Sequence, residues 1–137
     1  MFKKIPIAAI IVAAIPYILL GYPWYSIFRD PWFYGGGLTV EQLTTGPGYA
    51  EAFSVAILSS LVMAYILAFV LFRSGEQTML RGIKIAALMW LGFIAPLLAT
   101  QYMFEARTIA YFGINAGYPL LGMIIMGAII GGWKKKE

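Results

Sequence analysis

The chain has 137 residues, of which 61% are hydrophobic and only 12% are charged, and it contains neither cysteine nor histidine. A soluble domain carries about a quarter of its residues charged to cover its surface, so this composition excludes an ordinary water-soluble domain. The two missing residue types exclude disulfides, thiolate metal sites, a cysteine nucleophile and histidine in any catalytic or metal-binding role. The length indicates a single domain, residues 1–137.

Four apolar runs are long enough to cross a hydrocarbon core, which needs about 20 residues of helix. The second run has no charge between Glu51 and Arg73, and Lys84 lies one turn from the end of the third, where its side chain can reach the headgroups. We predict an all-α integral membrane protein within the lipid bilayer. It is a four-transmembrane-helix bundle with helices at about residues 5–21, 49–72, 83–102 and 108–133.

Basic residues gather on one side of this predicted bundle. Eight of the ten lie before the first helix, around the second loop or after the fourth helix, and only Arg29 and Arg107 fall on the other side. Lysine and arginine are enriched on the cytoplasmic side of membranes, so both termini are predicted to be cytoplasmic. The first helix starts like a secretory signal at Lys3 and Lys4, but no small-x-small cleavage site follows it, and we expect it to be retained.

The first helix is followed by a stretch rich in aromatic residues, proline and glycine, from Gly21 to Gly37. Aromatic rings are enriched where a helix reaches the membrane interface. Pro23 and Pro31 predict that the helix does not continue. The sequence Thr39-Val-Glu-Gln42 is typical of a capping box and predicts a short interfacial helix. We therefore expect a long first outer loop of about 26 residues.

Small residues recur at helical spacing and predict close helix packing. The first predicted helix has Ala9 and Ala13, and the fourth has two Gly-x-x-x-Gly pairs, at residues 113–117 and 127–131. This pattern fits packing inside one bundle. The alternative is a homo-oligomer through the stripe on the second helix, formed by Ala52, Ala56, Ser60, Ala64 and Ala68.

Interior prolines mark places where backbone carbonyls need new partners. Pro16, Pro96 and Pro119 each remove the donor that the carbonyl four residues earlier would use, and hydrocarbon offers no substitute. Pro119 acts on the carbonyl of Asn115, whose side-chain amide adds further hydrogen-bonding groups. At 1.5 Å per residue, Asn115 lies roughly 10 Å below the outer interface.

Polar residues concentrate in the outer half of the predicted bundle, and the inner half is nearly all aliphatic. This asymmetry favours a polar pocket entered from outside over a continuous pore. The alternative is that these residues hydrogen-bond one another and only set the helix register. They are Tyr17, Ser54, Thr100, Gln101 and Asn115, with Ser59, Ser60 and Tyr118 nearer the middle.

Glu105 and Arg107 lie in the short connection before the fourth helix. Side chains two residues apart on a helix do not face each other, so we expect each to pair elsewhere. Asp30 is the available partner for Arg107, and Arg29 is available for Glu105 or Glu51. The alternative is a set of solvated interfacial ion pairs.

Few side chains that could take part in catalysis are present. The outer carboxylates have no imidazole beside them, no serine lies in a Gly-x-Ser-x-Gly turn, and no glycine-rich phosphate loop precedes a Lys-Ser or Lys-Thr pair. The basic tail is too short for nucleic acid. We therefore predict no metal, no cofactor and no nucleic-acid partner, and we lean against an enzyme.

Several short motifs, taken in order, resemble the family catalogued as domain of unknown function 1761, small four-helix bacterial membrane proteins. They are Gly21 with Trp24-Tyr25-Ser26, Ser59-Ser60-Leu-Val-Met-Ala-Tyr65, Trp90-Leu-Gly-Phe93, Phe104-Glu105 and Ile114-Asn-Ala-Gly-Tyr118. The resemblance covers nearly the whole chain and implies a bacterial inner membrane. Relatives usually have histidine after the last motif, where this chain has Pro119, so any role of that histidine is absent here.

Three functions remain open. The first is binding, with transport as an option, of a small amphipathic molecule or lipid in an outward-facing intramembrane pocket. The second is a structural or accessory subunit that packs through small-residue helix faces, and the third is a membrane-embedded oxidoreductase-like enzyme. For the first, the candidate ligand-binding residues are Trp24, Tyr25, Ser26, Trp90, Glu105, Arg107, Asn115 and Tyr118.

Overall fold

A computed structural model describes residues 5–46, 48–75 and 77–133, and this part of the chain is helical with no strand. Lys3, Lys4 and the lysines at 134–136, which were used to predict the orientation, lie outside the described residues.

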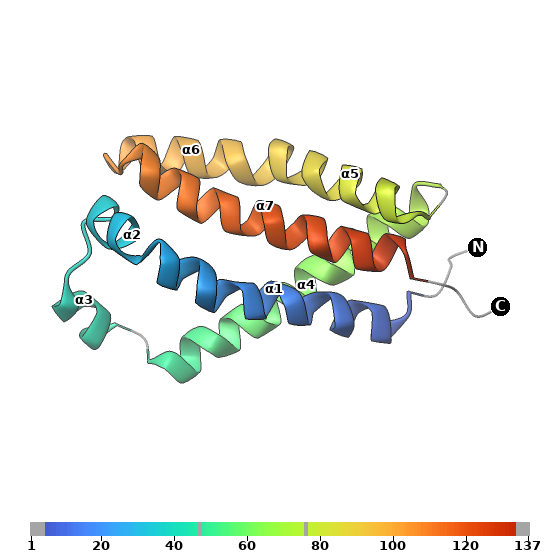
Figure 1. The fold of residues 1–137 in the computed structure, drawn as a ribbon, viewed down its shortest axis with the longest axis horizontal. Coiled ribbons are helices and arrows are strands. Elements are labelled where there is room, and N and C mark those ends of the chain that lie inside the picture. Colours follow the sequence, from blue (N-terminus) through green and yellow to red (C-terminus); the bar gives the residue numbers. More distant parts are fainter. Residues whose placement is uncertain (1–4, 47, 76, 134–137) are drawn as a thin grey trace.

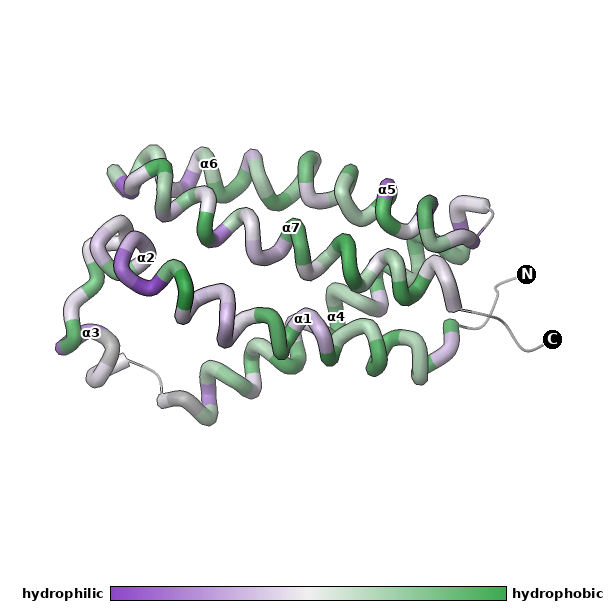
Figure 2. The backbone as a smooth tube through the Cα atoms, in the orientation of Figure 1, coloured by the Kyte–Doolittle hydropathy of each residue, from purple (hydrophilic) through white to green (hydrophobic). Residues whose placement is uncertain are grey.

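Four helical segments in the described ranges are long and apolar enough to cross a membrane, as predicted. Figure 1 shows α7 lying between α1 on one side and α5 with α6 on the other. Hydrophobic residues dominate all four segments, and a marked hydrophilic run lies at α2 (Figure 2). The segments are α1 (Ile7–Ile27), α4 (Tyr49–Arg73), the continuous run of α5 (Met79–Met89), a π-helix (Trp90–Ile94) and α6 (Ala95–Phe104), and α7 (Ile109–Gly131).

The bundle has two distinct ends. We call the end where α1 meets α2 and α6 turns into α7 the loop end. The end where α1 begins and α7 finishes is the termini end (Figure 1).

The first helix is longer than predicted. It continues through Pro23 to Ile27, and Pro31 lies inside a further helix, α2 (Arg29–Gly35). The expectation that these prolines stop the helix is therefore wrong. A proline removes one hydrogen bond, but side chains of the turn after Pro23 are bonded to α7, which holds that turn in place. Pro31 sits in the first turn of α2, where proline is tolerated.

The predicted capping box is confirmed. The Thr39 hydroxyl accepts from the Gln42 backbone N–H at 3.1 Å, and the Gln42 side chain accepts from the Thr39 N–H at 3.0 Å. These bonds satisfy donors that a helix start leaves unpaired. They begin the short helix α3 (Val40–Thr45), between α2 and α4.

The tightest helix contact joins α5 and α7 at the termini end. A Cβ atom added at Gly82 would overlap the Gly127 carbonyl, and one added at Gly127 would overlap the Gly82 carbonyl. A Cβ atom added at Gly131 would likewise overlap the Thr78 carbonyl. The Gly127/Gly131 pair therefore packs inside one chain, as small-residue motifs allow.

The second-helix stripe is divided by the fold. Its last three members are buried, whereas Ala52 and Ala56 are exposed. The side chains of residues 50–59 are all exposed, because the first half of α4 diverges from the rest of the bundle (Figure 1). The buried core consequently lies towards the termini end, where Leu67 and Leu71 pack with Met126 and Ile130.

Candidate functional site

Two indole rings hold the middle of α7 by its backbone. Trp24 of α1 donates from Nε1 to the Ile114 carbonyl at 3.0 Å, and Trp90 of the π-helix donates to the Ala116 carbonyl at 2.7 Å. These carbonyls flank that of Asn115, the one whose usual donor Pro119 removes. The two tryptophans therefore fix the polar turn of α7 from two neighbouring elements.

Three tyrosines gather beside this turn, and we call Tyr17, Tyr25 and Tyr118 the tyrosine cluster. The Tyr25 hydroxyl donates to Asn115 Oδ1 at 2.9 Å, and the Tyr118 hydroxyl donates to the Tyr17 carbonyl at 2.5 Å. The ring centroid of Tyr118 lies 4.8 Å from that of Tyr17 and 5.6 Å from that of Tyr25. The phenol protons of Tyr25 and Tyr118 are thus committed within the protein.

Glycines make this aromatic packing possible. A Cβ atom at Gly122 would overlap the Tyr17 ring, and one at Gly21 would lie 3.3 Å from the Tyr118 hydroxyl oxygen. Gly117 leaves room for the Trp24 ring, which would lie 3.0 Å from a Cβ there. The tyrosine cluster therefore depends on small residues of both α1 and α7.

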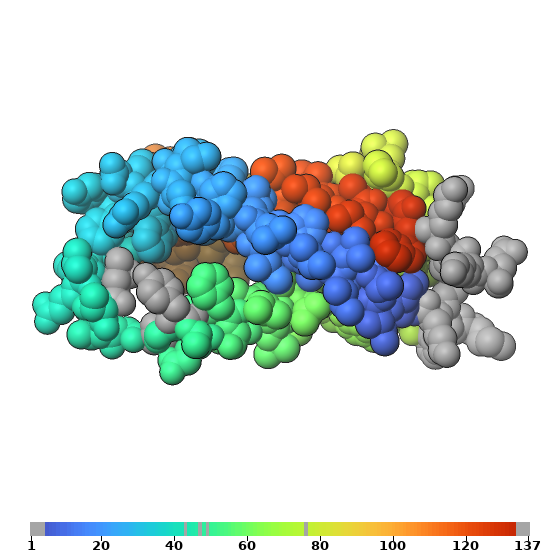
Figure 3. All heavy atoms as spheres, turned by 60° about the horizontal axis from the view of Figure 1, so that its bottom comes forward, coloured from blue at the N-terminus to red at the C-terminus, as the bar shows by residue number. Residues whose placement is uncertain are grey.

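A cleft of about 460 Å³ opens between α1 and the diverging half of α4, and we call it the α1–α4 cleft. Figure 3, which turns the α4 side forward, shows the surface hollowed between these two helices. Its volume lies within the range of about 300–1,000 Å³ typical of small-molecule sites. It is lined by Tyr17, Ile18, Gly21, Tyr22, Tyr25, Phe53, Ala56, Ser59, Met63 and Tyr118.

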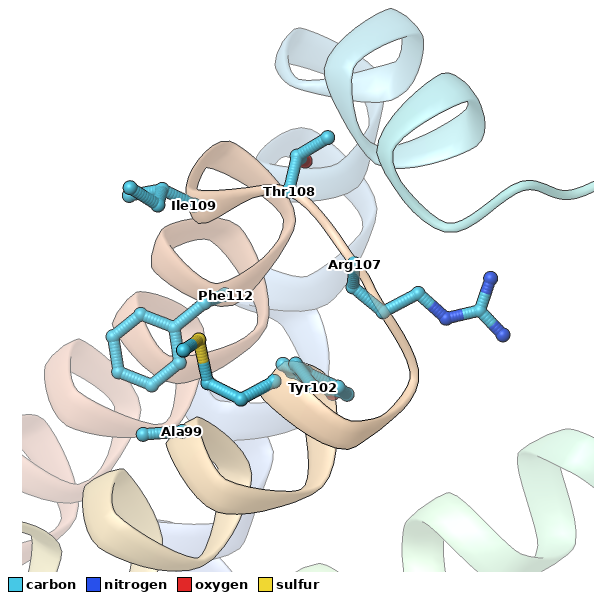
Figure 4. A pocket seen from close by; sticks show the side chains of 7 residues that line it. Ala99, Tyr102, Arg107, Thr108, Ile109 and Phe112 are labelled. Carbon is cyan, nitrogen blue, oxygen red and sulfur yellow. The ribbon is translucent and has the colours of Figure 1, made fainter.

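A smaller pocket of about 120 Å³ lies between α6 and α7 at the loop end. Figure 4 shows Phe112 and Ala99 close to each other, while the Arg107 guanidinium points away from both. The remaining lining residues are Tyr102, Met103, Thr108 and Ile109. This pocket is small and apolar, so the larger cleft is the better candidate site.

Glu105 and Arg107 pair with each other, and the expectation that each pairs elsewhere is wrong. Arg107 Nε lies 3.2 Å from Glu105 Oε1. The two residues lie in a turn rather than on a helix, and Ala106 between them has a positive φ of 56°, which brings their side chains together. Arg107 also donates from Nη1 to the Gly36 carbonyl, so the α6–α7 turn is tied to the end of α2.

The eight predicted site residues occupy four different places. Tyr25 and Tyr118 line the α1–α4 cleft, and Asn115 reaches it through its bond to Tyr25. Trp24 and Trp90 support α7 instead. Ser26 is exposed, and the pair Glu105 and Arg107 belongs to the α6–α7 turn.

Sequence reasoning missed most of the cleft lining. The α1 members, residues 17, 18, 21, 22 and 25, lie on one helical face. That face becomes visible in the sequence only when the helix is continued past Pro23. The α4 members are Phe53, Ala56, Ser59 and Met63. No local signal predicts that they face α1 across a gap.

Comparison with known proteins identifies one family. The family model described as "Protein of unknown function (DUF1761)" matches residues 8–131, which include most of α1 and all of the other three spans. No curated protein and no solved structure matches the chain. The family match agrees with the resemblance in the motifs and supplies no reaction.

Proposed function

The chain belongs to this family, and we propose that it is a multi-pass plasma membrane protein that binds a small amphipathic molecule or lipid in the α1–α4 cleft. The single observation that carries the proposal is the cleft itself. It is large enough for a ligand, is lined by residues of three apolar spans and includes the hydrogen-bonded tyrosine cluster in its lining.

The residues that line the cleft form an apolar group and a polar group. Ile18, Phe53 and Met63 offer apolar contact for a hydrocarbon part. Ser59 and the tyrosine hydroxyls offer polar contact for the other part. A few convergent polar groups in a mostly apolar cavity are the usual composition of a ligand site.

We further propose that the loop end faces outwards and that both termini are cytoplasmic, in a bacterial inner membrane. The loop end carries two basic and four acidic residues: Arg29, Arg107, Asp30, Glu41, Glu51 and Glu105. The termini end carries Arg73, Arg81 and Lys84 among the described residues. Basic residues favour the cytoplasmic side, which supports this orientation and makes the cleft outward-facing.

A cleft-filling variant tests the proposed function. Ala56 lines the cleft and Ala52, one turn earlier on the same helix, is exposed but does not line it. We would purify the parent, Ala56→Trp and Ala52→Trp in mild detergent and identify released small molecules by mass spectrometry. A compound bound by the parent and Ala52→Trp but lost from Ala56→Trp supports the proposal. A compound retained equally by all three refutes binding in this cleft.

An accessory-subunit role is the alternative, favoured by the exposed apolar half of α4 (residues 50–59). Ala64 is buried within the chain, so enlarging it would test folding rather than docking. Ala52→Leu enlarges the part of the stripe that remains exposed outside the cleft. Native mass spectrometry should then show a disrupted assembly if this face docks. An unchanged oligomeric state removes the support for docking.

A further inference from the structure

We infer that the ligand of the α1–α4 cleft is an amphipathic cation, a molecule with a hydrocarbon chain and an ammonium group. This inference rests on the proposed function and specifies that the ligand's polar end is positively charged. Three independent features support it: the use of the phenol protons, the aromatic lining and the charge of the loop end.

The first feature is that two of the cleft's four phenols, those of Tyr25 and Tyr118, have already used their protons. Tyr25 donates to Asn115 Oδ1 and Tyr118 donates to the Tyr17 carbonyl. A phenol has one donor, and its oxygen keeps acceptor capacity. These two hydroxyls can therefore accept a hydrogen bond from a ligand without breaking the contacts that hold α1 to α7. These two hydroxyls can donate to an anionic head only if those bonds break.

The second feature is the aromatic lining. Five of the ten lining residues are aromatic, and none of the ten is charged. Aromatic faces attract ammonium groups, and the attraction increases when the cation is removed from water. The Tyr118 ring is tilted by 45° to Tyr17 and by 71° to Tyr25, so these rings are not stacked face to face. Tyr22 lines the cleft at its exposed side and has no ring partner among the described residues.

The third feature is the net charge of −2 at the loop end, from two basic and four acidic residues. One of the two cations, Arg107, is bound by Glu105 and by the Gly36 carbonyl. A cation approaching this end is attracted and an anion is repelled, with a range set by the ionic strength. The rim and the lining thus select for the same charge.

The length of the cleft fits a hydrocarbon chain lying along the helices. Its α4 members run from Phe53 to Met63, which is about 15 Å of helix at 1.5 Å per residue. That is about half of a hydrocarbon core of roughly 30 Å. A single alkyl chain can therefore lie in the cleft within one leaflet, with its ammonium group against the tyrosines.

Three probes with the same chain and different heads test this inference. Purified protein in dodecyl maltoside is immobilised on scintillation beads and loaded with radiolabelled dodecyltrimethylammonium. Unlabelled dodecyltrimethylammonium, dodecanol and dodecanoate then compete for the site. We expect the ammonium compound to compete about tenfold better than dodecanol, and dodecanoate to be the weakest.

Tyr22 supplies the matched variants, since its side chain is 83% exposed and its replacement leaves the core intact. Tyr22→Leu should lower the preference for the cation over dodecanol severalfold, and Tyr22→Phe, which keeps a ring, should not. Equal lowering by both variants would overturn the role of the ring.

The outcomes separate this inference from the proposed function. Binding that Ala56→Trp abolishes, with dodecanol or dodecanoate competing as well as the cation, overturns the ammonium inference and leaves the cleft as a ligand site. Binding that Ala56→Trp leaves unchanged for every probe overturns the proposed function, and the inference with it.

Discussion

The close contact between α5 and α7 makes one stability prediction especially clear, because α7 carries its own control. Gly127 and Gly113 are both inside α7. A Cβ atom at Gly127 would overlap the Gly82 backbone, whereas a Cβ atom at Gly113 meets nothing within 4 Å. The two substitutions Gly127→Ala and Gly113→Ala therefore add the same methyl group to the same helix in opposite surroundings.

The expected difference follows from two effects. Alanine is favoured over glycine in a helix by up to about 1 kcal/mol, and this gain cancels when the two variants are compared. What remains is the cost of forcing the two backbones apart, about 1–3 kcal/mol for an overpacked contact. Gly127→Ala should therefore unfold with a free energy about 1–3 kcal/mol lower than Gly113→Ala.

The assay is unfolding in dodecyl maltoside micelles with increasing dodecyl sulfate, followed by circular dichroism and tryptophan fluorescence. The reciprocal variant Gly82→Ala should show the same loss, because it enters the same contact from α5. If Gly127→Ala proves as stable as Gly113→Ala, the close approach of the two backbones does not exist and the reasoning fails.

Two further predictions concern the loop end and the middle of α7. Trp90→Phe removes the N–H bond to the Ala116 carbonyl and should cost about 1 kcal/mol in the same assay; an unchanged stability would mean that this bond is not formed. Arg107→Gln should speed amide hydrogen exchange in α2 and α3, because it removes the tie to the Gly36 carbonyl, whereas Glu105→Gln should change exchange little, since an exposed ion pair contributes only about 0–1 kcal/mol. Equal effects of these two substitutions would contradict the tie.

The features that can be predicted from the sequence depend on local physical chemistry. Each span is a run of apolar residues long enough for the hydrocarbon core, so the four spans follow from composition and length. The start of α3 follows from Thr39 and Gln42, three residues apart, whose side chains and backbones satisfy one another. Such interactions join residues close in the chain, and no distant partner is needed to predict them.

Tertiary structure alone decided the path of the chain at Pro23 and the pairing of Glu105 with Arg107. The helix continues past Pro23 because Trp24 and Tyr25 bond to α7, about 90 residues away in sequence. The pair forms because the turn gives Ala106 a positive φ. At Pro23 the local rule was outweighed by distant contacts. At Glu105 and Arg107 the rule for helices did not apply, because the two residues lie in a turn, which Arg107 also ties to the Gly36 carbonyl.

The candidate site is the clearest product of the tertiary fold. Asn115 and Tyr118 were predicted from the polarity around Pro119, but the cleft exists because the first half of α4 diverges from the bundle and only its second half is buried. Periodicity along α4 indicates which residues share a face and carries no information on the angle at which the helix crosses α1. That angle is set by packing at the termini end, where Ala64 and Ala68 are buried, and the same packing leaves Phe53, Ala56 and Ser59 to face α1 across the cleft.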